Sequence, residues 1–371
     1  MRILYVTTIS LTMNSFFKPH IEMLIREGHT VDLACNATDR PLDVLYHDLG
    51  CQSFQIDFSR SPLSPSNVRA YKQLDNVIKN GHYDVVHCHT PNASVITRLV
   101  CRKYRKENGL KVFYTAHGFH FFKGAPKQNW MVYYPVEKWC SRYTDKLITI
   151  NIEDYTLAKQ KFHAEEVHYI PGVGVDLSRF EGVQTDKAEK RYEIGVPENA
   201  FLLLSVGELN VNKNHQVIVR ALAQLSRKDI HYAIAGEGDQ RDSLTELAAS
   251  LGVSDRVHLL GYQNDIPKLM YAADVFCFPS HREGLGLAAI EAMACGLPLI
   301  TSNVHGINDY SENGVTGYKC ASTDVEGFAK AIEKSAQSKE ERERIGEYNR
   351  TLAKKYDVIR IVDIMKTVYF Q

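Results

Sequence analysis

The sequence predicts an α/β fold class built from two consecutive doubly wound parallel sheets. Short apolar runs rich in β-branched residues alternate with longer amphipathic stretches along all 371 residues. Most of the short runs are apolar on both faces. This is typical of strands that helices cover on both sides, and such strands form parallel sheets. The length favours two domains over one or three, so we expect two sets of βα units in succession.

The predicted strands fall into two groups, and the segments between them are predicted helices. In the first half the strands are Ile3–Thr7, Thr30–Ala34, Ser53–Ile56, Asp84–Cys88, Lys111–Thr115, Lys146–Ile150 and Val167–Tyr169. In the second half they are Phe201–Val206, His231–Ala235, Val257–Leu260, Val275–Pro279, Pro298–Thr301 and Gly317–Lys319. Intervening stretches such as Phe17–Glu27 and Asn214–Ser226 have helical periodicity.

A stretch that contains proline and glycine separates the two groups. Ile170–Phe180 reads IPGVGVDLSRF, and a polar stretch follows it before the next strand. We therefore expect a first domain at residues 1–177 and a second at residues 178–354. The apolar-periodic run within residues 355–371 predicts a helix that crosses back onto the first domain.

Composition narrows the class of partner. Lys+Arg and Asp+Glu are both 44, so the formal charge is zero, and we expect no nucleic-acid partner. The first residues, MRILYVTTIS, predict a buried strand and not a signal peptide. No apolar stretch approaches the ~18 residues that a spanning helix needs. The eight cysteines include no CxxC pair, as expected for reduced thiols in a cytoplasmic protein.

The most informative segment is Phe278–Ser302, FPSHREGLGLAAIEAMACGLPLITS. It starts at the end of a predicted strand, passes through a turn with two glycines, and then predicts a helix over Leu287–Cys295 that Gly296 ends. Open parallel sheets bind ligands beyond the carboxyl ends of their strands. A helix that begins there offers N–H groups and a positive dipole to a phosphate.

Two glycines and two carboxylates give this turn its predicted chemistry. Gly284 and Gly286 let the backbone approach an oxyanion closely. Glu283 and Glu291 can accept hydrogen bonds from sugar hydroxyls. The layout suits a diphosphate between two sugars, with Glu283 on the transferred sugar and Glu291 on the ribose. The plainer alternative is one turn residue and one surface residue of a helix.

With its E-x7-E spacing and its PSxxEGxGLxxxEAMAxGxPxI pattern, the segment resembles retaining GT-B glycosyltransferases of family 4. These are the group 1 glycosyltransferases of bacterial capsule and exopolysaccharide biosynthesis. Ala235–Leu244 resembles the glycine-rich turn of the family, Gly261–Ser280 resembles its base-contacting loop, and matching features extend over essentially the whole chain. The resemblance implies two facing Rossmann-like domains with an inter-domain cleft. The N-terminal domain would bind the acceptor and the C-terminal domain the donor.

The resemblance also implies a reaction and a set of residues. A hexose or N-acetylhexosamine would move from a nucleotide-diphosphate sugar, by family habit a UDP-sugar, to a saccharide or polyprenyl-linked acceptor with retention of configuration. The implied catalytic residues are Glu283, His117 and Lys213. The implied donor-binding residues are Gly207, Glu237, Tyr262, Gly284, Leu285, Gly286, Leu287 and Glu291.

One position departs from the family pattern. Family members usually carry Arg where this chain has Glu208, whereas the Lys at position 213 is kept. A carboxylate beside a diphosphate would be repulsive unless it turns away or pairs with Lys213.

The acceptor-side candidates are weaker. We expect a polar loop at Thr7–Asn14, with Ser10 and Asn14 as candidate residues, and His120 as a further candidate. A plain capped turn would explain the polar residues of this loop equally well.

A metal site is a tempting reading of VVHCHTP, because His87 and His89 share one face of a strand. Tetrahedral zinc needs three or four ligands, and no other Cys/His cluster has suitable spacing, which favours structural or acceptor-cleft histidines. No Asp-x-Asp motif occurs. We therefore expect no metal and no cofactor, so that the helix terminus and Lys213 neutralise the leaving diphosphate.

Two segments suggest a membrane surface. Arg98–Lys106 predicts a basic amphipathic helix, and Phe119–Tyr134 is rich in aromatic residues. Together they could rest the acceptor domain on an anionic membrane, at the inner face of the cytoplasmic membrane. The alternative is one solvated helix and one aromatic core loop.

Two other functions remain open from the sequence. A nucleotide-sugar 2-epimerase shares the two-domain architecture. A non-catalytic nucleotide-sugar-binding subunit would explain Glu208 as decay. A dehydrogenase is disfavoured, because no GxGxxG follows the first strand.

Overall fold

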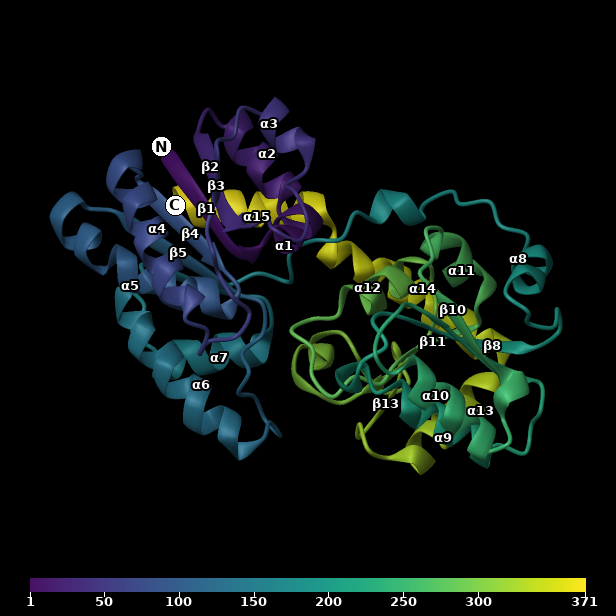
Figure 1. Cartoon of the computed structure of the whole chain (residues 1–371). Coiled ribbons are helices and arrows are strands. Elements are labelled where there is room, and N and C mark those ends of the chain that lie inside the picture. Colours follow the sequence, from purple (N-terminus) through teal and green to yellow (C-terminus); the bar gives the residue numbers. More distant parts are fainter. The chain divides into compact units, whose positions relative to one another are not determined.

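The computed structural model describes residues 1–371 and divides them into two compact units (Figure 1). The first unit comprises residues 1–174 and 358–371, and the second comprises residues 175–357. The limits expected from the sequence were 177/178 and 354/355.

The first unit is built on a seven-stranded parallel sheet with the order β3-β2-β1-β4-β5-β6-β7. Its strands are β1 Arg2–Ile9, β2 Thr30–Asn36, β3 Ser53–Gln55, β4 Val85–His89, β5 Lys111–Ala116, β6 Lys146–Thr149 and β7 Glu166–Tyr169. Its helices are α1 Ser10–Phe16, α2 Lys18–Arg26, α3 Val44–Asp48, α4 Ser66–Gly81, α5 Pro91–Asn108, α6 Lys127–Cys140, α7 Ile152–Lys161 and α15 Val358–Phe370.

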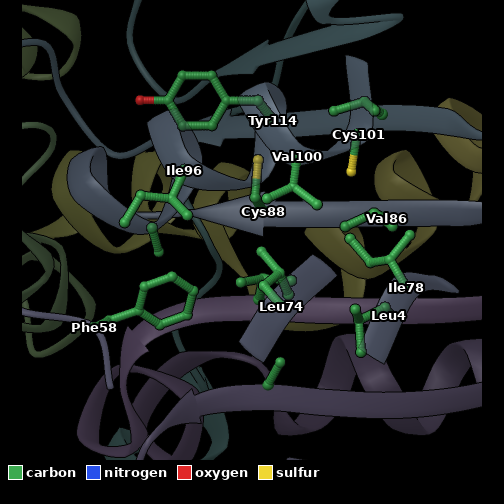
Figure 2. Packing of buried hydrophobic residues seen from close by; sticks show 14 of the residues in the cluster. Leu4, Phe58, Leu74, Ile78, Val86, Cys88, Ile96, Val100, Cys101 and Tyr114 are labelled. Atoms are coloured by element: carbon green, nitrogen blue, oxygen red, sulfur yellow. The ribbon is translucent and has the colours of Figure 1, made fainter. Parts of the chain in front are cut away.

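Alternate side chains of the first sheet enter two different layers. On one face, Leu4 and Val86 pack against Leu74 of α4 and Val100 of α5 in a fully buried cluster (Figure 2). The opposite face is covered by α2 and by α15, the yellow C-terminal helix of Figure 1. Lys146 donates to the carbonyl of Val368, which ties α15 to β6 at 2.8 Å. The last helix therefore completes the first unit.

The second unit contains a six-stranded parallel sheet with the order β10-β9-β8-β11-β12-β13. Its strands are β8 Phe201–Val206, β9 Ile230–Ala235, β10 Val257–Gly261, β11 Val275–Phe278, β12 Leu299–Ser302 and β13 Gly317–Cys320. Its helices are α8 Lys187–Glu193, α9 His215–Gln224, α10 Arg241–Ser250, α11 Ile266–Ala272, α12 Leu287–Ala294, α13 Val325–Gln337 and α14 Lys339–Ala353.

The predicted fold class is confirmed, because each unit is a Rossmann-like parallel sheet between helices. The strand order reverses between β1 and β4 in the first sheet and between β8 and β11 in the second. At such a reversal the connections leave toward opposite faces, and a crevice opens beyond the carboxyl ends of the two strands.

The predicted loop at Thr7–Asn14 is wrong. β1 continues to Ile9, which pairs with Asn36, and α1 begins at the next residue. The β-branched residues Thr7, Thr8 and Ile9 favour the extended conformation, and no glycine interrupts the passage from strand to helix.

The predicted basic surface on α5 is also smaller than expected, because Arg98 points into the core. Arg98 is 1% exposed, and its Nη2 lies 2.8 Å from Glu137 Oε2 of α6. Its Nε donates to the carbonyl of Ser94, and the guanidinium lies 4.3 Å from the ring centroid of Tyr114. None of the helices has the length and apolar character that a membrane-spanning segment requires.

Removing Glu137, the partner of this buried charge, should destabilise the fold. We expect Glu137→Ala to lower the free energy of unfolding by about 3–5 kcal/mol, because Arg98 is left buried without a counter-charge. The exposed pair of Arg69 with Asp57 in the same unit provides the control. Arg69→Ala should cost no more than about 1 kcal/mol. Urea unfolding of both variants tests this, and equal losses would contradict the role given to the buried pair.

Candidate active site

The loops after β8 and β11 meet at the strand reversal of the second sheet and are bonded to each other. The backbone N–H of His281 donates to the carbonyl of Asn212 at 2.8 Å. The side-chain amide of Asn212 donates to the carbonyl of Arg282 at 3.0 Å. The two loops therefore form one continuous wall at the carboxyl edge of the sheet.

The backbone of the predicted glycine turn is closely packed. Gly286 has φ +93°, and a Cβ at this position would lie 2.4 Å from a ring carbon of Phe278. A Cβ on Gly306 would lie 1.9 Å from the carbonyl oxygen of Gly284. Gly286 is the N-cap of α12, and no side chain caps this helix. Its first N–H groups therefore remain available to an anion.

Two of the predicted catalytic residues meet here, Lys213 from the loop after β8 and Glu283 from this turn. Lys213 Nζ is 2.7 Å from Glu283 Oε1, and both side chains are largely shielded. The same ammonium lies 4.8 Å from the ring centroid of Phe278. The structure thus places one cation and one carboxylate directly at the beginning of α12.

Glu208 turns away and does not pair with Lys213. Its side chain is exposed, and its Oε2 accepts a hydrogen bond from the Asn210 amide at 2.9 Å. Lys213 pairs with Glu283 and not with Glu208. The carboxylate of Glu208 is therefore held within its own loop.

Glu291 lies one turn into α12 and is partly buried. Burial raises the pKa of its carboxyl, and the positive charge of Arg179 opposes that rise. Arg179 belongs to the short helix Leu177–Phe180, which packs against α12. Sequence reasoning missed Arg179, because the segment was interpreted only as a domain boundary.

The other predicted donor-binding residues occupy the same edge of the second sheet. Gly207, Glu237 and Tyr262 follow β8, β9 and β10, and the side chain of Tyr262 is 73% exposed. Gly207 and Gly236 approach so closely that a Cβ on Gly236 would lie 1.9 Å from the Gly207 oxygen.

Leu285 and Leu287 differ in what they can offer a ligand. Leu285 is 3% exposed, and its carbonyl accepts a hydrogen bond from the Tyr310 hydroxyl. Its apolar side chain therefore belongs to the core. Leu287 is the first residue of α12, so its backbone N–H is one of the unpaired donors of that helix.

In the first unit, His117 follows β5 at the carboxyl edge of the sheet. Its Nε2 lies 3.1 Å from Nδ1 of His89, the last residue of β4. Burial, with a smaller contribution from the neighbouring His20, lowers the pKa of His117 to about 4. The imidazole is therefore neutral near pH 7.

A cavity of about 310 Å³ opens at the strand reversal of the first sheet. Its lining residues include Thr8, Thr12, Arg60, Asn92, His120 and Tyr133. Of the three acceptor-side candidates, only His120 lines it. Arg60 and Tyr133 were missed, because they come from segments that approach the sheet only in the folded chain.

Ser10 and Asn14 do not line this cavity, because local backbone groups use their side chains. The Ser10 hydroxyl donates to the carbonyl of Arg40. The Asn14 amide donates to the carbonyl of Pro41 and accepts from the Asp43 N–H. Both residues hold the 40–43 loop against α1.

No group of three or more His, Cys, Asp or Glu side chains in the chain is arranged to hold a metal ion. His87 is fully buried and hydrogen-bonds through both ring nitrogens, to Tyr369 and to Thr115. His89 contacts His117 instead of a ligand set.

Comparison with known proteins identifies the class. Residues 20–179 match the model of glycosyltransferase family 4, and residues 186–352 match the model of glycosyl transferases group 1. The protein named glycosyltransferase EpsD, from Bacillus subtilis (strain 168), is 38% identical over 99% of this chain and 96% of its own length. The chain belongs to the family 4 (group 1) glycosyltransferases and acts on nucleotide sugars.

One further relative and one solved structure are similar to this chain over nearly their full length. An Escherichia coli enzyme, UDP-Gal:alpha-D-GlcNAc-diphosphoundecaprenol alpha-1,3-galactosyltransferase, is 27% identical over 94% of this chain and 90% of its own. The structure of Anabaena HepE in complex with UDP and glucose superposes with a TM-score of 0.78 at 21% identity, over 100% of both chains. The structural likeness supports the GT-B fold.

The buried carboxyl of Glu291 should make stability depend on pH. Its pKa in the folded chain lies above the ordinary value of 4.5, so the folded protein binds more protons than the unfolded chain just above that pH. The contribution of this group to stability therefore falls as pH rises through that window. We expect Glu291→Gln to gain thermal stability relative to the parent on going from about pH 4 to about pH 7.

Thermal unfolding at the two pH values tests this expectation. Glu291→Ala is the matched variant. Its thermal stability relative to the parent should show the same trend with pH. Lost packing should lower that stability by an equal amount at both pH values. A difference between parent and Gln variant that is equal at both pH values would mean that burial does not penalise the charged carboxylate.

Proposed function

We propose that this chain transfers a hexose or N-acetylhexosamine from a UDP-sugar to a saccharide carried on a lipid diphosphate, with retention of configuration, in surface polysaccharide synthesis. The observation that carries the proposal is the uncapped beginning of α12 with Lys213 and Glu283 beside it. No metal takes part in this proposal.

On donor binding, Lys213 would exchange the carboxylate of Glu283 for the diphosphate as its partner. Lys213 pairs with Glu283 at 2.7 Å. A diphosphate at the beginning of α12 would attract the ammonium of Lys213, and Glu283 would turn its oxygens to the hydroxyls of the sugar. Glu291 then accepts from the ribose. The loops after β9 and β10, with Glu237 and Tyr262, contact the base.

The reaction breaks the bond between the anomeric carbon and the phosphate oxygen. Negative charge grows on the leaving diphosphate, and the N–H groups of α12 together with Lys213 stabilise it. The neutral ring of His117 donates a hydrogen bond to a substrate oxygen. An acceptor hydroxyl attacks from the face that the phosphate leaves, and the phosphate takes its proton. This course needs no second, nucleophilic carboxylate of the kind that retaining hydrolases use.

The cavity of the first unit suits an anionic acceptor. Arg60 is the only charged residue of its lining, and the side chains of Thr8, Thr12 and Asn92 offer hydrogen bonds. Asn92 also holds the segment of Arg60 in place by donating to the carbonyls of Ser59 and Arg60. The lipid diphosphate acceptor of the E. coli relative, as its name describes it, would place a phosphate near Arg60 and a sugar near Tyr133.

A surface of α6 suits an anionic membrane. Met131, Val132, Val136 and Trp139 of this helix are 76%, 58%, 40% and 43% exposed. The Trp139 ring packs edge-on against Tyr143, and the guanidinium of Arg102 lies 5.8 Å from the Tyr143 ring centroid. An apolar stripe and a basic edge therefore adjoin, as in helices that lie in a membrane interface. The aromatic residues before α6 differ, since Phe119, Phe121 and Phe122 are buried.

Substitution of Glu283 tests the catalytic proposal. We expect Glu283→Gln to reduce kcat by about a hundredfold or more, because the contact with the reacting sugar is altered while the fold is kept. Glu208→Gln changes a carboxylate in the neighbouring loop and should retain nearly parental kcat. Transfer is measured with UDP-sugars and a synthetic lipid-diphosphate saccharide. Parental rates for both Glu283→Gln and Glu291→Ala would refute the assignment.

A panel of nucleotide sugars identifies the donor. A ligand that binds only the folded chain raises the midpoint of thermal unfolding. We expect UDP-sugars to stabilise the protein more than GDP- or ADP-sugars do. Product analysis with the stabilising donor alone then separates the alternatives: an isomerised sugar indicates an epimerase. Binding without transfer to any acceptor indicates a non-catalytic subunit.

Vesicle sedimentation tests the membrane surface. The parent should bind vesicles with 30 mol% (about one in three) anionic lipid, and Trp139→Ser combined with Met131→Ser should weaken binding about tenfold through lost apolar burial. Tyr192→Ser removes an exposed aromatic side chain of the second unit and is the control. Equal binding of all three proteins would exclude α6 as the contact surface.

A further inference from the structure

His89 has one hydrogen-bond partner and one nitrogen without any. The residue is 2% exposed and packs its ring against Tyr5 and Phe17, with centroids 5.1 and 4.1 Å away. Its Nδ1 lies 3.1 Å from His117 Nε2. Its Nε2 is buried and makes no hydrogen bond.

His117 presents its other nitrogen to solvent. Its only hydrogen bond uses Nε2, the atom that faces His89. Its Nδ1 makes no hydrogen bond and is not sealed off from solvent, and the residue is only partly shielded. Nδ1 is therefore the ring atom that a substrate can reach.

The contact between the two rings admits two arrangements of protons. Burial lowers the pKa of both histidines, so both rings are neutral, and a single proton lies between Nδ1 of His89 and Nε2 of His117. If His117 donates this proton, His89 carries its own proton on the buried Nε2, where no acceptor exists. If His89 donates, the unmatched Nε2 is a bare lone pair. A buried N–H without an acceptor is rarer in proteins than a buried lone pair without a donor. The arrangement in which His89 donates is therefore favoured.

We propose that His89 is a positioning residue: its Nδ1–H donates to His117 Nε2 and so holds His117 in the tautomer that carries its proton on Nδ1. The exposed edge of His117 is then a hydrogen-bond donor and not an acceptor. A donor at this edge suits a phosphate or sugar oxygen. The opposite tautomer would present a lone pair, which cannot bond a phosphate oxygen because that oxygen has only lone pairs to offer. The proposal rests on the proposed function only for the role of His117.

The tautomer itself can be measured without any substrate. In protein labelled with 15N-histidine, long-range proton–nitrogen correlation distinguishes the protonated from the bare ring nitrogen. The His117 signals are assigned by their loss in His117→Gln. We expect His117 in the parent to carry its proton on Nδ1. A proton on Nε2 would overturn the proposal, whatever the activity of the enzyme.

Two substitutions of His89 separate a positioning role from packing. In His89→Asn the side-chain amide can replace the Nδ1–H donor, whereas His89→Leu fills similar space and cannot donate. Free histidine prefers the proton on Nε2. We therefore expect His117 to revert to that tautomer in His89→Leu and to keep the Nδ1 proton in His89→Asn. Circular dichroism and thermal unfolding show whether both variants are folded, and the measurement on the parent needs neither of them.

Kinetics completes the test. We expect His89→Leu to lower kcat about ten- to a hundredfold, by analogy with the loss seen when the hydrogen-bond partner of a metal-binding histidine is removed, with little change in KM for the donor. His89→Asn should recover most of the rate. Parental kcat in a folded His89→Leu variant would overturn the positioning role. Parental kcat in His117→Gln would instead refute the proposed role of His117, while the measured tautomer would stand.

Discussion

The ion pair between Lys213 and Glu283 is the contact around which the site of the second unit is organised. It joins the loop after β8 to the loop after β11, the two strands at which the sheet reverses its order. Two hydrogen bonds between Asn212 and the residues before Glu283, one from the backbone and one from the Asn212 side chain, reinforce the same junction. The cation of one loop is therefore neutralised by the carboxylate of the other.

The two units use one architecture for different chemistry. Both place their candidate residues beyond the carboxyl ends of parallel strands, at the point where the strand order reverses. In the second unit the groups are a helix terminus, a lysine and two carboxylates, which suits a charged phosphate next to a sugar. In the first unit burial lowers the pKa of His89 and His117, so both are neutral, and the cavity has a single arginine as its charged residue. Neutral donors and one cation suit hydroxyl groups and a phosphate that does not react.

Much of the fold and the centre of the site could be predicted from the sequence, because they depend on local pattern. Strands that are apolar on both faces identify a parallel sheet, and the two glycines before Leu287 identify the turn into α12. The rest depends on contacts between distant segments. Arg98 lies in a basic stretch, yet it points inward because it pairs with Glu137, which lies 39 residues further along the chain. Ser10 and Asn14 have suitable side chains, but the 40–43 loop uses them. The pairing of His89 with His117 arises only when β4 and β5 lie side by side.

The place of α15 has a consequence for how the protein is made. This helix closes the face of the first sheet that carries His87, and its Tyr369 bonds that histidine directly. During synthesis the strands of the first unit leave the ribosome long before residues 358–371 do. Domains generally fold as units in the order of their emergence, but here the earlier unit must wait for the last helix while the later unit already has all of its elements. A growing chain therefore exposes the apolar back of its first sheet for most of its translation.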